Sequence, residues 1–487
     1  MLRIIIVFTH LLIALCLTTE AQQVIAQLDF ERKDAKPMYY EYCPADGGLA
    51  TLGPMSARST RFIGINKYDA ALQHQWVKQV FEQNGRRNID FVTAIGSSIF
   101  VFVSEFFPRE KVIKTFYFKY DLEGNRLVNG DILSVYPNQK KQKVDLQYVL
   151  SPNKKKLLCY KNLQSRKELE KILYYVFDES GDFLQNGEIS LKYPDQKFSI
   201  RRIKVSNQGN IFILGKHYKE NRVKGPRDFE YLMYRHDTQT ETGKEVNIDL
   251  GTLYISDLAF KLDKFENIYL AGFYSKRGTD QITGTIFQKL NPENDVEINS
   301  TEEFGEEFLG KFLSSGQINR GRELKNFYLN NIILRSDGGV VLLAEKYYIT
   351  YTNFRDIYGY WQERELYHYD DIIVTSISGN GQIEWHAVVD KRQAGENPNN
   401  LSYFSAIGSS STYLIYEYKP QGGSINIYYN QVGIEGETSM RKPLLKDYRY
   451  SHDFYPRDCE QINNKEAIMV YYNKRSKTLS VARTLIE

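Results

Sequence analysis

The chain has 487 residues, of which 42% are hydrophobic and 25% are charged, and this balance excludes a disordered or collagen-like chain. Its 63 basic and 60 acidic residues leave a formal net charge of +3, so net charge gives no drive toward nucleic acid or other polyanions. Four cysteines without a close pair argue against a disulfide framework and against a zinc-binding spacing.

The first 21 residues have the pattern of a secretory signal peptide. Arg3 precedes an apolar run over residues 4–17, and the small residues Thr19 and Ala21 follow at the two positions that a signal peptidase reads. The run is too short for a comfortable membrane span of about 20 residues. We therefore predict a secreted, periplasmic or cell-surface protein with no membrane span after cleavage. An anchor helix is the alternative, and a lipidated Cys16 is a weaker one.

The densest basic cluster combines Lys140, Lys141 and Lys143 with a second group at 154–156. The second group lies in Ser-Pro-Asn-Lys-Lys-Lys, a composition typical of an exposed turn. We interpret both groups as solvated loops and predict no nucleic-acid partner, although a patch for nucleic acid or an acidic glycan is the alternative.

The mature chain keeps three cysteines, Cys43, Cys159 and Cys459. One disulfide could form in an oxidising compartment, but the sequence does not choose the pair. Cys159, in Leu-Leu-Cys-Tyr, has the surroundings of a buried strand residue.

Short strands repeat along the chain. The 37 Tyr and 27 Phe fall in alternating or apolar runs separated by Gly, Asn, Asp and Ser turns. One half of the unit is a strand, a polar turn and a very apolar strand, as in Ile203–Val205 followed by Ile211–Gly215. The other half is a strand, an acidic or glycine-containing turn and an amphipathic strand, as in Tyr174–Phe177 followed by Asp-Glu-Ser-Gly-Asp.

Together these halves make a four-stranded unit of roughly 45–65 residues, which is the period of a propeller blade. We predict an all-β fold, a single β-propeller over residues 22–487 with about seven blades. The starts of the blades fall near residues 88, 144, 198, 253, 325, 402 and 448.

The last unit shows only three strands, and the strand-like segments 61–66 and 74–81 precede the first complete unit. We therefore expect an N-terminal strand to complete the last blade and close the propeller. A pair of β-sandwiches is the alternative architecture.

Two stretches depart from the repeat. In residues 298–323 the apolar side chains Phe304, Phe308 and Phe312 share one helical face, which predicts a short helical insertion packed on a blade. Residues 348–369 are a long excursion between two strands of one blade, predicted to be a long aromatic loop.

Three segments of the chain, 335–348, 369–374 and 381–393, resemble exported β-propeller proteins of Gram-negative bacteria. The resemblance is clearest over residues 325–435 and implies a propeller outside the cytoplasm. It brings no established active site. The repeat is also loosely similar to WD40 and kelch propellers, although their regular Trp-Asp and double-glycine patterns are missing.

Catalytic signatures are absent from the sequence. It contains no Gly-x-Ser-x-Gly elbow, no His-Glu-x-x-His, no P-loop and no EF-hand loop, so we predict no cofactor and no metal site. The histidines occur singly, and Asp370 and Asp371 would point to opposite faces of a strand. A pair of carboxylates from different blades, as in a glycosidase, remains open.

The aromatic excursion is the best binding candidate, because rigid aromatic side chains offer contact area at low entropic cost. The candidate ligand-binding residues are Tyr358, Tyr360, Trp361, Tyr367, His368 and Tyr369. Packing of these rings onto their own blade is the alternative.

We predict a non-enzymatic binding module of the cell envelope with a glycan or protein ligand. The alternative is a hydrolase or lyase acting on polysaccharide or peptide in the central channel, and a structural envelope subunit is a third reading. The sequence determines neither the ligand nor the oligomeric state.

Overall fold

The computed structural model describes residues 24–31, 33–137, 146–163, 168–219, 229–355, 357–445 and 451–486. The predicted signal peptide, residues 1–21, lies outside the described residues, as do Lys140, Lys141 and Lys143. The second basic group lies in the predicted exposed turn between two strands of one sheet.

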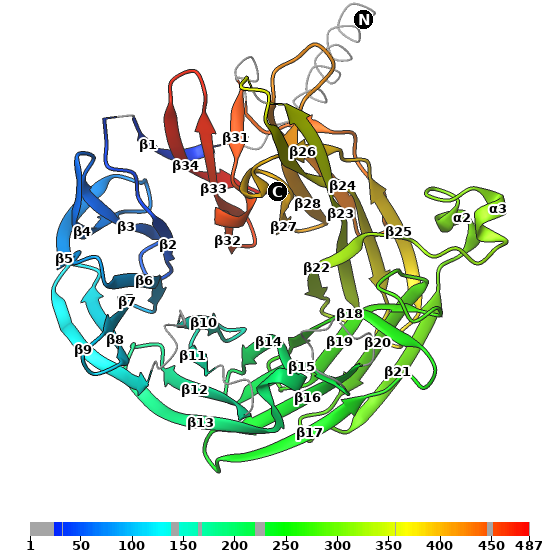
Figure 1. Cartoon of the computed structure of the whole chain (residues 1–487), viewed down its shortest axis with the longest axis horizontal. Helices are drawn as coiled ribbons and strands as arrows, with labels where there is room; N and C mark the ends of the chain where they lie inside the picture. Colours follow the sequence, from blue (N-terminus) through cyan, green and yellow to red (C-terminus); the bar gives the residue numbers. More distant parts are fainter. Residues whose placement is uncertain are drawn as a thin grey trace, which may run out of the picture. The chain divides into compact units, whose positions relative to one another are not determined.

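Antiparallel β-sheet makes up nearly all of the regular structure, in eight sheets that each contain a meander of consecutive strands (Figure 1). The chain forms two compact units. The larger unit is Lys33–Glu396, and the smaller one combines the N-terminal segment with Asn397–Glu487. We number the sheets 1 to 8 in chain order, with sheets 1–6 in the larger unit.

The strands of the larger unit follow the chain without interruption. Sheet 1 contains β2 (Tyr39–Cys43), β3 (Gly48–Ser56), β4 (Ser59–Tyr68) and β5 (His74–Glu82). Sheet 2 contains β6 (Arg87–Ile95), β7 (Ser98–Phe107), β8 (Val112–Asp121) and β9 (Arg126–Pro137). Sheet 3 contains β10 (Gln147–Leu150), β11 (Leu157–Leu163), β12 (Leu169–Phe177) and β13 (Phe183–Pro194). Sheet 4 contains β14 (Phe198–Val205), β15 (Ile211–Tyr218), β16 (Phe229–Asp237) and β17 (Thr242–Ile248). Sheet 5 contains β18 (Tyr254–Leu262), β19 (Ile268–Ser275), β20 (Gly284–Leu290) and β21 (Val296–Glu303). Sheet 6 contains β22 (Phe327–Leu334), β23 (Val340–Arg355), β24 (Trp361–Ile377) and β25 (Ile383–Val389), with β26 (Gln393–Gly395) paired to β24.

Polar side chains close the recurrent turns. Asp121 Oδ1 accepts a hydrogen bond from the backbone N–H of Asn125, four residues later, at 2.7 Å. Asp178 and Asp263 make the same contact at 2.9 and 3.0 Å. The turns of Asp121 and Asp178 join the last two strands of sheets 2 and 3, and the turn of Asp263 joins the first two strands of sheet 5. An acidic side chain that satisfies a turn amide in this way explains why acidic residues recur in these turns.

Each of sheets 2 to 5 packs its two faces on two different neighbours. On β15, Phe212 and Leu214 belong to a core shared with sheet 5, whereas Ile211 and Ile213 belong to a core shared with sheet 3. Such alternation follows from the two-residue period of a strand. Burying each of these side chains contributes about 1.5–3 kcal/mol, so a sheet gains most of its stability from its neighbours.

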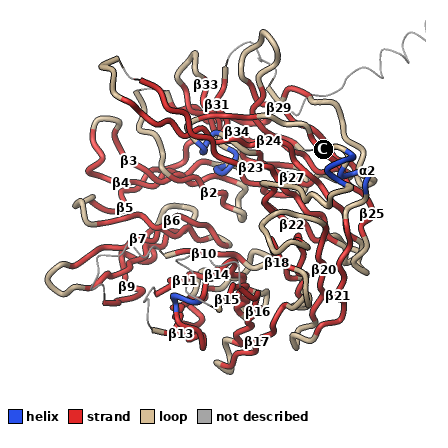
Figure 2. The backbone as a smooth tube through the Cα atoms, turned by 45° about the vertical axis from the view of Figure 1, so that its right-hand side comes forward, coloured by secondary structure: helices blue, strands red, loops and turns tan. Residues whose placement is uncertain are grey.

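The sheets of the larger unit follow one another along an arc, with the first strand of each on the inner side (Figure 1), and they form successive layers of strands in Figure 2. Polar contacts tie successive sheets together near one edge. Trp76 Nε1 of sheet 1 donates to the carbonyl of Leu122 in sheet 2 at 2.8 Å, and Lys119 Nζ of sheet 2 lies 3.2 Å from Asp182 of sheet 3. This stacking of consecutive meanders is the architecture of a β-propeller.

The smaller unit contains sheets 7 and 8. Their strands are β27 (Tyr403–Ile407), β28 (Ser411–Tyr418), β29 (Asn426–Gly433), β30 (Lys442–Pro443); and β31 (His452–Phe454), β32 (Glu460–Asn463), β33 (Glu466–Asn473), β34 (Thr478–Leu485), with the N-terminal strand β1 (Val24–Phe30). β1 pairs antiparallel with β34, so Leu28 lies opposite Val481. Tyr471 Oη also donates to Gln27 Oε1 at 2.9 Å.

The all-β propeller prediction is confirmed. An N-terminal strand completes the last sheet as expected, and residues 24–30 supply it. Segments 61–66 and 74–81 belong to β4 and β5 of a complete first sheet, so the described residues form eight sheets where about seven blades were predicted. The seven predicted starts lie within four residues of the first strands of sheets 2 to 8.

Two one-turn helices occupy part of the predicted helical insertion, α2 (Glu306–Leu309) and α3 (Ser315–Ile318), whereas residues 298–303 belong to β21. Phe304 and Phe308 are buried and stack near His386 of β25. Burial lowers the pKa of His386 to about 4, so this imidazole is neutral and serves packing. The other short helices among the described residues are 3₁₀ turns at Asp195–Lys197, Pro398–Asn400 and Pro456–Asp458.

All three described cysteines are free thiols, and Cys43 and Cys159 are buried in strands. No helix among the described residues is long and apolar enough to cross a bilayer. Within the same residues, no three His, Cys, Asp or Glu side chains are grouped so as to hold a metal ion.

Candidate functional site

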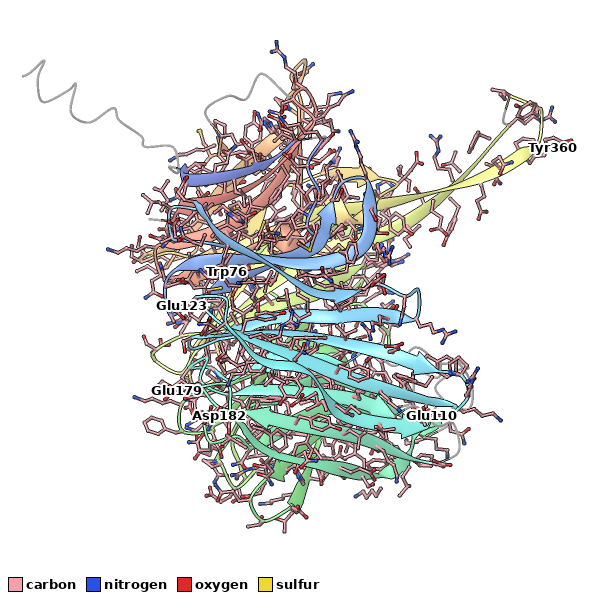
Figure 3. The ribbon with its side chains drawn as sticks, turned by 90° about the vertical axis from the view of Figure 1, so that its left-hand side faces the viewer. Trp76, Glu110, Glu123, Glu179, Asp182 and Tyr360 are labelled. Carbon is pink, nitrogen blue, oxygen red and sulfur yellow. The ribbon has the colours of Figure 1, made fainter. Side chains whose placement is uncertain are left out.

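A two-stranded arm extends from sheet 6. β22 pairs with β23 only as far as Lys346, and β25 pairs with β24 only from Ile372 onward. Beyond these points β23 and β24 continue as a ribbon from Tyr347 opposite Tyr369 to Arg355 opposite Trp361. We call residues 347–369 the arm; Tyr360, near its tip, lies far from the other sheets of the larger unit (Figure 3). The predicted loop is thus a regular β-ribbon over most of its length.

One face of the arm carries an aromatic stripe. Residues that lie opposite each other in an antiparallel pair share a face, and the faces alternate along each strand. The pairs on this face, which we call the aromatic face, are Tyr347–Tyr369, Ile349–Tyr367, Tyr351–Glu365, Asn353–Glu363 and Arg355–Trp361.

The aromatic face is buried at the base of the arm and exposed toward its tip. Tyr369 is only 8% exposed, and its ring lies 4.8 Å from that of Tyr347. Tyr351 and Trp361 are 58% and 66% exposed. The Arg355 guanidinium lies 4.9 Å from the centre of the Trp361 ring, a cation–π contact that holds the ring across the ribbon.

The opposite face stiffens the ribbon. The rings of Tyr348 and His368 stack at 4.4 Å with an angle of 4°, and His368 Nε2 lies 2.8 Å from Thr350 Oγ1. Arg364 lies over the Phe354 ring at 4.9 Å. Cross-strand pairs of this kind each contribute about 0.2–1 kcal/mol. Since an isolated two-stranded ribbon is only marginally stable, these pairs are what keep the arm extended.

A buried ion pair anchors the arm to its sheet. Lys391 Nζ lies 2.8 Å from Glu345 Oε1, and the two side chains are 0% and 1% exposed. The same ammonium donates to the carbonyl of Tyr369 and to Gln393 Oε1, each at 2.7 Å. Burial lowers the pKa of Lys391, and the Glu345 carboxylate opposes that effect.

Two arm tyrosines have a pKa above the ordinary value of a tyrosine. Tyr367 Oη donates to Glu365 Oε2 at 2.8 Å, and this bond raises the pKa of Tyr367. Burial, followed by a hydrogen bond to Asp370, raises the pKa of Tyr348. Both groups are therefore donors at neutral pH, with no tendency to act as bases.

The structure divides the six predicted binding residues among four places. Tyr358 and Tyr360 lie in the exposed turn, and Trp361 and Tyr367 lie on the aromatic face. His368 lies on the opposite face, and Tyr369 is buried at the base. Sequence reasoning missed Tyr351 and Arg355. The alternation of Tyr347, Ile349 and Tyr351 was the available signal.

Carboxylates on the innermost strands of the larger unit already have protein partners. Glu41 of β2 accepts hydrogen bonds from Thr93 Oγ1 and the backbone N–H of Ala94, both on β6, at 3.1 and 3.0 Å. Asp257 of β18 accepts from the N–H of Leu329 on β22 at 3.1 Å. Each of these carboxylates thus ties two sheets together.

These repeated sheets and this projecting arm define a β-propeller protein with a ribbon-like appendage. No family model matches the sequence, and no curated protein matches it significantly. Solved structures with similar folds include the WD40 domain of SCAP from fission yeast, at 9% identity and a TM-score of 0.42, covering 94% of this chain and 98% of that one. The β-propeller domain of the Trilobed protease from Pyrococcus furiosus has 12% identity and a TM-score of 0.38, covering 86% and 97%. An α-L-arabinofuranosidase from Fusarium graminearum has 10% identity and a TM-score of 0.30, covering 67% and 93%. These likenesses carry no functional assignment.

Proposed function

We propose that the protein is a non-enzymatic module of the cell envelope that binds another protein through the arm. The observation that carries this proposal is the aromatic face, with Tyr351 and Trp361 exposed on a ribbon that projects from its sheet. Export rests on the signal-peptide pattern of residues 1–21. The partner is a polypeptide rather than a glycan, for two reasons that concern the backbone and the charges of the arm.

The backbone of the arm offers two open edges. Among the described residues, 350–355 and 361–366 form strand pairs only with each other. A free strand edge presents a row of backbone donors and acceptors, which an extended peptide can match by adding a strand. A glycan has no such periodic partner groups, so the edges favour protein.

The charges of the aromatic face indicate the chemistry of the partner strand. Glu363 and Glu365 lie on this face, and its one cation, Arg355, is engaged with Trp361. A partner strand that alternates apolar and basic side chains would place its apolar groups against the rings and its basic groups against the carboxylates.

The test is site-specific photo-crosslinking of the full-length protein in its native host. A photoreactive phenylalanine analogue at position 351 should give a discrete protein adduct, whereas the same analogue at position 352, on the opposite face, should give at least fivefold less. Trp361→Ser should abolish the adduct from position 351. The matched control, Phe354→Ser on the opposite face, should leave it unchanged.

Two outcomes would overturn the proposal. The first is equal crosslinking from positions 351 and 352. The second is binding to a glycan array that requires Tyr351 and Trp361, because it would make the aromatic face a carbohydrate platform instead.

A further inference from the structure

Five cationic side chains lie on the first two strands of sheet 4 and the first strand of sheet 5. Arg201, Arg202 and Lys204 lie on β14, Lys216 lies on β15, and Lys261 lies on β18. We call these five residues the cationic cluster. Its arginines are exposed and its lysines are half-buried. Figure 1 shows β14 and β18 on the inner side of the arc of the larger unit.

Strand register directs three of these side chains to the same side. Arg202 lies opposite Leu214, and Lys204 lies opposite Phe212. Since Leu214 and Phe212 face sheet 5, Arg202 and Lys204 do so as well. Lys216 is two residues beyond Leu214 on β15 and shares its face. The three cations therefore line one side of sheet 4.

A β-bulge exposes the fourth cation. The register of β14 shifts between Ile200 and Arg202, so Arg201 is an extra residue in the strand. Bulges re-aim side chains and are common beside binding sites. β6, β18 and β22, the inner strands of three other sheets, contain comparable shifts. The bulge is thus a feature of the repeat, and in sheet 4 its extra residue is a cation.

No described carboxylate forms a salt bridge with the cationic cluster. Asp257 is the nearby acid whose charge acts on Lys216, but its oxygens accept from the backbone N–H groups of Leu258 and Leu329 at 3.0 and 3.1 Å.

Burial and repulsion between the cations of the cationic cluster lower the pKa of its lysines. Burial, followed by the charges of Lys261 and Arg202, lowers the pKa of Lys204 to about 8. Burial, followed by the charge of Arg201, lowers the pKa of Lys216 to about 8, with Asp257 acting in the opposite direction. An anion among these groups would relieve the repulsion and restore their ordinary pKa values.

A buried hydroxyl without a partner adjoins the cationic cluster. Tyr231 lies opposite Lys216 in the pairing of β15 with β16 and is 1% exposed. Among the described residues its Oη has no hydrogen-bond partner. Burial raises its pKa, which keeps it a donor. The Lys216 ammonium lies 4.9 Å from the Tyr231 ring centre and 3.8 Å from that of Phe229. Buried hydroxyls are normally bonded, so this donor is unexplained by the protein alone.

Related sheets show that the fold does not need these charges. Lys204 and Lys261 are the last-but-one residues of their inner strands, just before the turn. The same position holds Ala94 in β6, Val149 in β10 and Ile333 in β22. Apolar side chains thus suit this position, so the fold does not explain why sheets 4 and 5 have lysines there.

We propose that the cationic cluster, together with the Tyr231 hydroxyl, is a binding site for a polyvalent phosphate group. Arginine forks and lysine ammonium groups are the side chains that bind phosphate oxygens best, because each contact is a charge-assisted hydrogen bond. The phosphate is either a free inorganic anion or part of a phosphorylated sugar. This site is separate from the arm and does not depend on the proposed function of the arm.

Isothermal titration of the full chain with inorganic pyrophosphate at low ionic strength tests the proposal. We expect saturable binding that weakens as sodium chloride is added. Lys204→Gln combined with Lys216→Gln should weaken binding at least tenfold. The matched control replaces Lys244 and Lys276, exposed lysines on the same two sheets, with glutamine and should bind as the wild type does.

Tyr231→Phe removes one donor without changing charge and should weaken binding severalfold, which keeps the test valid if the double variant folds poorly. A second titration, with glucose 1-phosphate, separates the two sources of the phosphate. Tighter binding of glucose 1-phosphate than of pyrophosphate indicates a sugar phosphate. Absence of binding to both ligands at millimolar concentration, or equal loss in the control variant, overturns the proposal.

Discussion

Replacing Lys391 with methionine should destabilise the base of the arm by about 3–5 kcal/mol, because a buried carboxylate would lose its counter-ion. Lys391 is 0% exposed and its ammonium contacts three acceptors within 2.8 Å, one of them the Glu345 carboxylate. Methionine fills similar volume, so the loss is electrostatic rather than a cavity. By comparison, Lys276→Met removes a surface ion pair whose side chains are 52% and 54% exposed, and it should change stability by less than about 1 kcal/mol.

Hydrogen exchange of the β23 and β24 amides, followed by mass spectrometry, measures this effect locally. Since every 1.4 kcal/mol is a factor of ten, Lys391→Met should speed exchange there by about two to four orders of magnitude. Adding Glu345→Leu removes the orphaned charge and should restore much of the protection, because an apolar pair can replace a buried ion pair. Exchange in Lys391→Met within tenfold of the wild type, or no recovery in the double variant, would refute the reasoning.

Three further perturbations follow from the structure. Burial raises the pKa of Glu417 to about 8 from an ordinary 4.5, so the stability that its protonated form provides is present below pH 4.5 and is lost as pH rises through 8. The Tm should therefore fall between pH 5 and 8. Glu417→Gln should flatten that slope in scanning fluorimetry. A Cβ at Gly272 would overlap the carbonyl of Asp257 at the bulge of β18. Gly272→Ala should therefore lower the free energy of unfolding in urea by at least about 2 kcal/mol. A smaller effect would mean that the bulge can move to make room for the methyl group. Trp361 is 66% exposed, so Trp361→Phe should remove the most acrylamide-accessible tryptophan fluorescence and change stability by less than about 0.5 kcal/mol.

The repeat was readable from sequence wherever a turn signal separated two apolar strands. Ile203–Val205 and Ile211–Gly215 were predicted as one such pair, and they form the paired parts of β14 and β15. Local side-chain alternation and turn chemistry are short-range signals, so a sequence carries them directly.

Sheet 1 was not recognised as a complete unit, although segments 61–66 and 74–81 were predicted as strands, because the apolar pattern around them is weak. β3 contains Gly53 and Pro54, and the first four residues of β4 are exposed. An N-terminal strand was predicted to close the last blade, but the sequence did not identify β1 as that strand, since its partner β34 lies more than 440 residues away and a pairing at that distance leaves no local trace. The arm escaped recognition as strand because both of its faces meet solvent near the tip, where no burial pattern is required.

The six candidate residues could be located by their aromatic character but not assigned to faces. Which rings share a face depends on the register between β23 and β24, and that register places His368 on the side away from Trp361. The cationic cluster was invisible in sequence for the same reason, since Arg202 and Lys216 become neighbours only through strand pairing.

Lys204→Ile separates the two roles that a lysine at this position could have. The substitution introduces the aliphatic character that β22 has in Ile333, so a purely structural lysine would have no advantage over it. Burial and neighbouring cations lower the Lys204 pKa from 10.5 to about 8, which corresponds to a penalty of at most about 3 kcal/mol for the charged form. Removing the lysine should therefore raise the free energy of unfolding at pH 7 by about 1–2 kcal/mol while weakening pyrophosphate binding.

The pH dependence gives a second readout of the same substitution. An unfolded chain binds more protons at Lys204 than the folded chain between pH 8 and 10.5, so the wild type gains stability as pH rises through that window. The advantage of Lys204→Ile should be complete below pH 8 and fade toward pH 10.5 in urea titrations. A variant that is less stable than the wild type at pH 7 and binds pyrophosphate equally well would show that Lys204 serves the fold. A more stable variant with weaker binding would show that stability is held below its maximum for the sake of the anion, as functional sites often require.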